Sequence, residues 1–71
     1  MASFKPREVI SILKKLGFVY KRQTGSHVMM YNPISGETIP IPYHVKDLKK
    51  GVLHSVIKRA GSTEEEFLKL K

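Results

Sequence analysis

The stretch that decides the fold runs from residue 18 to residue 42 and reads FVYKRQTGSHVMMYNPISGETIPIP. Two turn signals, TGS at 24–26 and PISGE at 33–37, divide it into three short segments. Gly25 supplies the positive φ that a tight turn between two strands requires. The pattern therefore predicts three consecutive antiparallel strands joined by hairpin turns. The predicted strands cover residues 18–23, 27–32 and 38–42.

Side-chain alternation assigns the two faces of the predicted sheet. In the second strand Val28 and Met30 point to one side, and His27, Met29 and Tyr31 point to the other. The pattern alone permits either parity. We choose the first pair as the buried one, because the opposite choice would bury an imidazole without an evident partner. His27 is then expected at the rim of the open face.

The third strand is expected at an edge of the sheet, with Ile39 and Ile41 directed to the core. Pro40 has no backbone N–H, so this strand cannot be paired on both sides without losing a hydrogen bond. A central position for residues 38–42 is therefore excluded.

Helices are predicted on both sides of the strand region. The first covers KPREVISILKKLGF (5–18), with Pro6 in its first turn and Gly17 in the left-handed position that ends it. Its expected apolar stripe is Val9, Ile10, Leu13 and Leu16, with Arg7, Lys14 and Lys15 toward water.

A basic connector, YHVKDLKKG (43–51), leads to a second helix, VLHSVIKRAG (52–61). The apolar positions of that helix are Leu53, Val56, Ile57 and Ala60, which leaves His54 in solvent. A short last helix lies in STEEEFLKLK (62–71), where Thr63 and Glu66 fit a capping box, and Phe67 and Leu70 can pack inward.

The predicted fold is a single α+β domain over residues 1–71. It has the order α-β-β-β-α, a three-stranded antiparallel sheet with helices on one face, and a short C-terminal helix. This is the layout of a double-stranded-RNA-binding domain, a class that reads A-form shape through 2′-hydroxyl and phosphate contacts.

Charge points to a polyanionic partner. Residues 1–60 hold eleven bases and three acids, a net +8, whereas residues 61–71 hold two bases and three acids, a net −1. Such a field attracts phosphate without specifying the polymer, and nucleic acid is the usual partner. The alternative is a solvated surface that only keeps the protein soluble. Lys46, Lys49 and Lys50, just before a helix N-terminus, are candidate phosphate contacts, although three solvated lysines in a loop are the alternative.

Several other classes of function find no support in the sequence. There is no cysteine, which excludes disulfides and thiolate metal sites and fits a cytoplasmic setting. The N-terminus lacks a signal peptide, and no run approaches the roughly 20 apolar residues of a membrane span. The three histidines do not have metal-ligand spacing, so we expect no metal and no cofactor.

The order LKKLGF…GSH…IPYH…LKKGVLHSVIKRAG…EEF resembles the HicA-type (YcfA-like) mRNA interferase toxins of toxin–antitoxin pairs. The resemblance covers the chain from the first helix to Phe67, through short motifs whose order is specific. It implies a toxin that cleaves mRNA independently of the ribosome and is neutralised by a HicB-type antitoxin. His27, in Gly-Ser-His, stands where that family carries its catalytic histidine, and His44 at its second recurring histidine. Val52 departs from the more usual Gly-Thr-Leu, which weakens capping or a phosphate contact there.

One histidine without a carboxylate partner can serve this chemistry, because RNA carries its own nucleophile, the 2′-hydroxyl. A general base that removes its proton contributes about 10²–10⁴-fold. His27 is therefore predicted as catalytic base, although a histidine after a turn is otherwise more often a plain surface residue. The predicted RNA contacts are Lys46, Lys49, Lys50, Ser26 and His44.

Other roles stay open at this stage. His44 could contact phosphate or act as an acid, or it could fasten the connector to the sheet through a backbone hydrogen bond. Met29 and Tyr31 are predicted to contact the antitoxin, although Tyr31 could instead stack on a base. The main alternative to an endoribonuclease is a non-catalytic double-stranded-RNA-binding module of the same fold, and a third reading is an inert homologue kept as an interaction partner.

Overall fold

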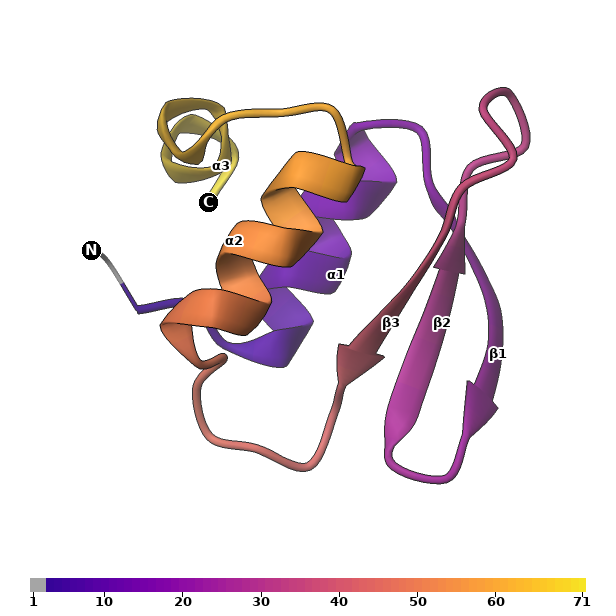
Figure 1. Cartoon of the computed structure of the whole chain (residues 1–71), viewed down its shortest axis with the longest axis horizontal. Helices are drawn as coiled ribbons and strands as arrows, with labels where there is room; N and C mark the ends of the chain where they lie inside the picture. Colours follow the sequence, from indigo (N-terminus) through magenta and orange to yellow (C-terminus); the bar gives the residue numbers. More distant parts are fainter. Residues whose placement is uncertain (1–2) are drawn as a thin grey trace.

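The computed structural model describes residues 3–71 and has the order α1 (Pro6–Lys15), β1 (Val19–Thr24), β2 (His27–Tyr31), β3 (Thr38–Pro42), α2 (Lys50–Arg59) and α3 (Glu64–Leu70). The three strands form one antiparallel sheet in the order β1-β2-β3. In Figure 1, α1 and α2 both lie on one side of the sheet, and α3 lies farther from the sheet than they do. The predicted α+β fold is confirmed.

The sheet buries one face against the helices, and the chosen parity is correct. Val28 and Met30 are buried, whereas His27 is exposed, and Met29 and Tyr31 are half-buried. The buried side chains form one core, to which both β2 and β3 and all three helices contribute. Strand β1 is exposed along its whole length, and only Phe18, just before it, joins the core. The members of the core are Phe4, Val9, Ile12, Leu13, Phe18, Val28, Met30, Ile39, Ile41, Leu48, Leu53, Val56, Ile57 and Phe67.

The predicted stripe of α1 needs a correction. Ile12 is buried, whereas Ile10 and Leu16 are only half-buried at the margin of the core. The physical reason is that α1 packs against α3 as well as against β1 and β3, so that its buried face is wider and turned relative to a helix that meets a sheet alone. Helix α1 also ends at Lys15, earlier than predicted, and Gly17 follows with φ of 98°.

Besides Ile12, the core residues Phe4, Phe18 and Leu48 were not predicted. Phe4 precedes α1 and packs edge-to-face on Phe67 of α3, with ring centroids 6.2 Å apart. Leu48 lies in the basic connector, and its backbone N–H donates to the Phe4 carbonyl at 2.9 Å. These contacts fix the connector against the start of α1.

The third strand is an edge strand, as Pro40 predicts. Along a strand, successive N–H groups point alternately toward and away from the neighbouring strand. The Tyr43 N–H just after β3 points inward, because it donates to the Ser26 carbonyl at 2.7 Å. The nitrogens of Pro40 and Pro42 therefore face outward, where their missing hydrogens cost nothing. The free edge of β3 consequently offers few donors to another strand.

The topology gathers several segments at one end of the molecule. The β1–β2 turn, the connector between β3 and α2, and the first turns of α1 and α2 all lie at the lower end of Figure 1. The β2–β3 turn lies at the opposite end. The sequence motifs GSH and YHVKDLKK thus come together in space.

Candidate functional site

His27 occupies the first position of β2, directly after the β1–β2 turn. Gly25 has φ of 56° in that turn, a conformation that side chains with a Cβ rarely adopt. The turn leaves His27 exposed at the sheet's end, paired across the sheet with Thr24 on one side and Pro42 on the other. Its imidazole makes no hydrogen bond to any other residue within 3–71, so both ring nitrogens are free for a ligand.

A groove of about 350 Å³ runs between the open edge of β3 and helix α2, and His27 lines one end of it. Its other lining residues are Ile39, Pro40, Pro42, Gly51, Val52, Ser55, Val56 and Arg59. Gly51 and Val52 belong to the first turn of α2, so the imidazole shares the groove with a helix N-terminus. Of the residues in the described range 3–71, no aspartate or glutamate lines the groove.

Arg59 ties α2 to β3 along this groove. Its Nε lies 2.7 Å from Glu37 Oε2, and its Nη2 donates to the Thr38 carbonyl at 2.5 Å. The second bond occupies a carbonyl of the open strand edge. Arg59 is therefore a structural cation, and its charge is already matched by Glu37.

The first turn of α2 has an unusual charge pattern. Lys49 is the N-cap residue and makes no side-chain cap, Lys50 is the first helical residue, and the turn contains no acid. Helix N-termini favour negative charge, so two exposed lysines there are unfavourable for the helix by themselves. Helix α3 shows the ordinary pattern, with Thr63 accepting from the Glu66 N–H at 3.1 Å and three acids in its first turn. The start of α2 is consequently suited to an anion from outside the chain.

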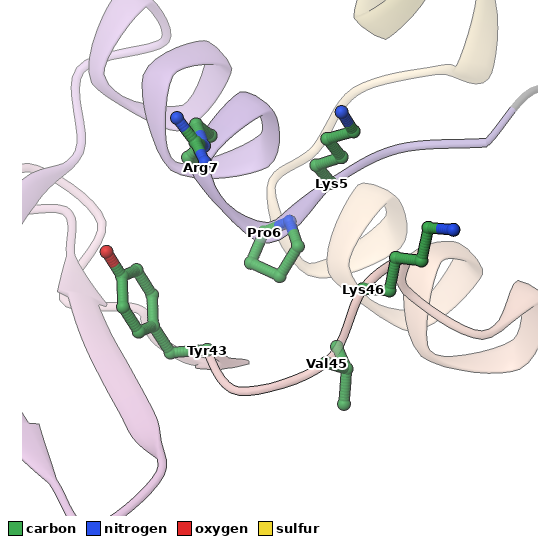
Figure 2. A pocket seen from close by; sticks show the side chains of 6 residues that line it. All are labelled: Lys5, Pro6, Arg7, Tyr43, Val45 and Lys46. Atoms are coloured by element: carbon green, nitrogen blue, oxygen red, sulfur yellow. The ribbon is translucent and has the colours of Figure 1, made fainter.

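Helix α2 begins two residues earlier than predicted, which moves Lys50 from the connector into the helix. Lys46 lies apart from Lys49 and Lys50. It lies with Lys5 and Arg7 around a second hollow of about 320 Å³, which Figure 2 shows from close by. The predicted lysine cluster is thus divided: Lys46 lines the hollow, whereas Lys49 and Lys50 line neither concavity and stand at the start of α2, directly before Gly51 of the groove.

The connector is fastened to the β1–β2 turn by Tyr43 through the backbone hydrogen bond to Ser26. His44 is exposed and meets the Tyr43 ring edge-on, with centroids 5.7 Å apart. Within residues 3–71 its imidazole makes no hydrogen bond, so the structural role considered for His44 falls to the backbone of its neighbour. His54 is exposed on α2, as predicted.

The open face of the sheet carries Met29 and Tyr31 beside His27. Both are half-buried by their cross-strand neighbours, and the Lys21 ammonium lies 5.2 Å from the centre of the Tyr31 ring. Cation–π contact of this kind leaves the outer face of the ring available. The face is therefore apolar at its centre with a basic margin.

The site residues that sequence reasoning missed are Lys5, Arg7 and Tyr43 in the hollow, and Ser55 in the groove. One signal could have found the first two. Lys5 and Arg7 flank Pro6 at the start of a helix, where the helix dipole disfavours bases. The others depend on which elements meet in space, which the local sequence does not encode.

The described residues offer no candidate for a metal site or for a membrane-spanning helix. Among residues 3–71, no group of three or more histidine, aspartate or glutamate side chains could hold a metal ion. No helix in the same range is long and apolar enough to cross a membrane.

Comparison with known proteins identifies the family. The model of a family described as the HicA toxin of bacterial toxin–antitoxin matches residues 6–62, which is most of the chain and includes α1, the sheet and α2. A comparison with curated proteins gives no significant match. The matched range contains the GSH turn, the groove and the first turn of α2. The chain belongs to the HicA toxin family, the toxin component of a toxin–antitoxin pair whose partner is a HicB-type antitoxin.

Proposed function

We propose that this toxin is an endoribonuclease that cleaves mRNA, with His27 as the general base. The observation that carries the proposal is an exposed imidazole in a groove that Gly51 and Val52 of α2 also line, directly after the two lysines at the start of that helix. That arrangement combines a proton acceptor with an anion site. It supplies the two functions that intramolecular cleavage of RNA demands from an enzyme.

The reaction that fits this site uses the RNA's own 2′-hydroxyl. His27 removes the hydroxyl proton, the 2′-oxygen bonds to the adjacent phosphorus, and the bond from phosphorus to the 5′-oxygen breaks. The leaving oxygen takes a proton from solvent. The products are a 2′,3′-cyclic phosphate and a 5′-hydroxyl.

The chain's own groups stabilise charge in this scheme. Lys49, Lys50 and the free N–H groups of the first turn of α2 bind the non-bridging phosphate oxygens, on which negative charge builds up in the transition state. Ser26, whose carbonyl is held by Tyr43, keeps its hydroxyl free for a neighbouring phosphate. Lys46 and His44 bind RNA farther along the connector.

Inhibition by the antitoxin follows from the same surface. We infer that an acidic or apolar patch of the HicB-type partner covers His27, Met29 and Tyr31 on the open sheet face. RNA and antitoxin then compete for overlapping surface, and the toxin is silent while it is bound.

The decisive test is incubation of the purified chain with RNA in EDTA, followed by analysis of product ends. We expect cleavage with cyclic phosphate ends, and a loss of about 10²–10⁴-fold in rate for His27→Ala. His54→Ala is the matched control, because His54 is an exposed histidine on α2 outside the groove. Circular dichroism should show that both variants are folded. Intact RNA after incubation with the wild-type chain, or cleavage by His27→Ala at the wild-type rate, would refute the proposal.

A further inference from the structure

The second hollow lies next to the candidate active site and plays no part in the chemistry proposed for His27. It is lined by Lys5, Pro6, Arg7, Tyr43, Val45 and Lys46, which come from the start of α1 and from the connector after β3. Figure 2 shows the Pro6 ring at its centre, the Tyr43 ring on one side, and Lys5 and Lys46 on the other. The hollow thus has flat apolar walls and a basic margin.

Tyr43 is 45% exposed beside the hollow, and its backbone is anchored to the β1–β2 turn. Its backbone N–H is bonded to Ser26 at 2.7 Å, and its ring meets the His44 ring edge-on at an interplanar angle of 77°. An exposed aromatic side chain usually loses rotamer freedom when it binds a ligand. Here part of that ordering has already occurred, which favours binding to the ring face.

The cations of the hollow are not neutralised within the described residues. Among residues 3–71, none of the salt bridges involves Lys5, Arg7 or Lys46. Glu8 is the nearest acid along α1, but its carboxylate accepts the Lys5 backbone N–H at 2.8 Å and lies 4.0 Å from Lys71. The side chains of Lys5 and Arg7 therefore stay available for an external anion.

We propose that this hollow binds one nucleotide of single-stranded RNA, with its base stacked on Tyr43 and its flanking phosphates held by Arg7, Lys5 and Lys46. The proposal rests on RNA as the ligand of this toxin and adds a defined subsite to it. A planar ring, a proline floor and several cations form the combination that single-strand binders use, in which stacking tolerates any base and cations follow the backbone.

The subsite is coupled to His27 through the chain itself. The Ser26 carbonyl accepts the Tyr43 N–H, and His27 is the residue after Ser26. One backbone hydrogen bond therefore links the segment that carries the stacking ring to the segment that carries the general base. A nucleotide fixed on Tyr43 would set the register of the strand in the groove. Tyr43 is thereby a positioning residue for the substrate rather than a participant in proton transfer.

The test measures binding in a His27→Ala background, so that RNA stays intact. Fluorescence anisotropy follows a labelled single-stranded 12-nucleotide RNA and a series in which one abasic nucleotide is moved along it. The variants are Tyr43→Ala, Tyr43→Phe and Tyr20→Ala. Tyr20 is the matched control, because it is 54% exposed and lies on β1 outside both concavities.

Removing the ring should weaken binding of the intact RNA about 5- to 150-fold, whereas Tyr43→Phe and Tyr20→Ala should change it less than about twofold. With Tyr43 present, an abasic nucleotide at one position should lower the RNA affinity by a similar factor. In Tyr43→Ala, the same abasic nucleotide should leave the affinity almost unchanged. This non-additivity identifies the stacked base, and a merely structural role of Tyr43 would not produce it.

Several results would overturn the subsite. The first is that Tyr43→Ala and its parent bind the RNA with equal affinity. The second is that the loss of affinity in Tyr43→Ala adds to the loss from an abasic nucleotide at every position. The third is that Tyr43→Ala loses the same factor in affinity for a blunt RNA duplex as for the single strand. The outcome is separable from that of the proposed function. His27-dependent cleavage without an abasic signature removes only the subsite, whereas the signature without any cleavage by the wild-type chain removes only the nuclease.

Discussion

Lys50→Glu should stabilise the fold and weaken RNA binding at the same time. Lys50 is the first residue of α2, is exposed, and has no acid beside it in the first turn. A charge near a helix end contributes about 0.3–1 kcal/mol at low ionic strength. The exchange removes an unfavourable charge and adds a favourable one, so the expected gain is about 0.6–2 kcal/mol. Lysine and glutamate have nearly equal helix propensities, so backbone preference adds little.

Thermal unfolding at low salt measures the first effect. In a domain of this size 1 kcal/mol corresponds to about 4–8 °C in Tm, so Tm should rise by about 2–15 °C. The gain should shrink as salt screens the helix end. RNA affinity, measured across a salt series, should fall, and the slope of log K against log salt should decrease by about one unit for the lost phosphate contact.

Lys58→Glu is the matched control, because Lys58 is an exposed residue in the last turn of the same helix. The change in net charge is identical, but its position relative to the helix dipole is reversed. It should lower Tm and leave the salt slope closer to that of the wild type. The reasoning is wrong if Lys50→Glu lowers Tm, or if both exchanges weaken RNA binding equally.

Four further outcomes are expected. Phe4→Ala should cost about 3–5 kcal/mol in the free energy of unfolding by urea, because its ring is fully buried against α3; a change under 1 kcal/mol would contradict the packing. His44→Ala should change the free energy of unfolding by urea by less than about 0.5 kcal/mol, since the backbone of Tyr43 holds the connector. Val52→Thr should strengthen RNA binding about 2- to 10-fold in an anisotropy assay by adding a hydroxyl to the groove. Antitoxin should displace RNA in a competition assay, and a ternary complex that cleaves at the full rate would exclude occlusion.

The strands and their faces were predictable because their signals are local. Gly25 admits the positive φ that the turn requires, Pro40 fits only an edge strand, and alternation in β2 follows from the pleat alone. The choice of Val28 as the inward residue needed one energetic argument, the cost of burying His27 without a partner, and the structure agrees with it. The family match confirms the resemblance that the order of these motifs indicated.

The errors arose where tertiary contacts decide. The stripe of α1 was assigned as if the helix met only a sheet, but α3 packs on it too and brings Ile12 into the core. Leu48 looked like part of a basic, solvated connector, whereas it is buried and bonded to Phe4. No spacing rule relates residues 4, 48 and 67, because they meet only after the sheet has brought both helices together.

The same limit explains how the candidate site was predicted only in part. Lys46, Lys49 and Lys50 are close in sequence and were taken as one phosphate cluster. The structure places Lys46 in the hollow with Arg7 and leaves the other two at the start of α2, outside both concavities. The two lysines at the start of α2 stand against the helix dipole and cost some stability there. Helices α1 and α3 each carry acid in the first turn, which is the favourable pattern. Among the three helices of residues 3–71, the charge rule is therefore broken only at the start of α2, which is where the proposed function expects a phosphate.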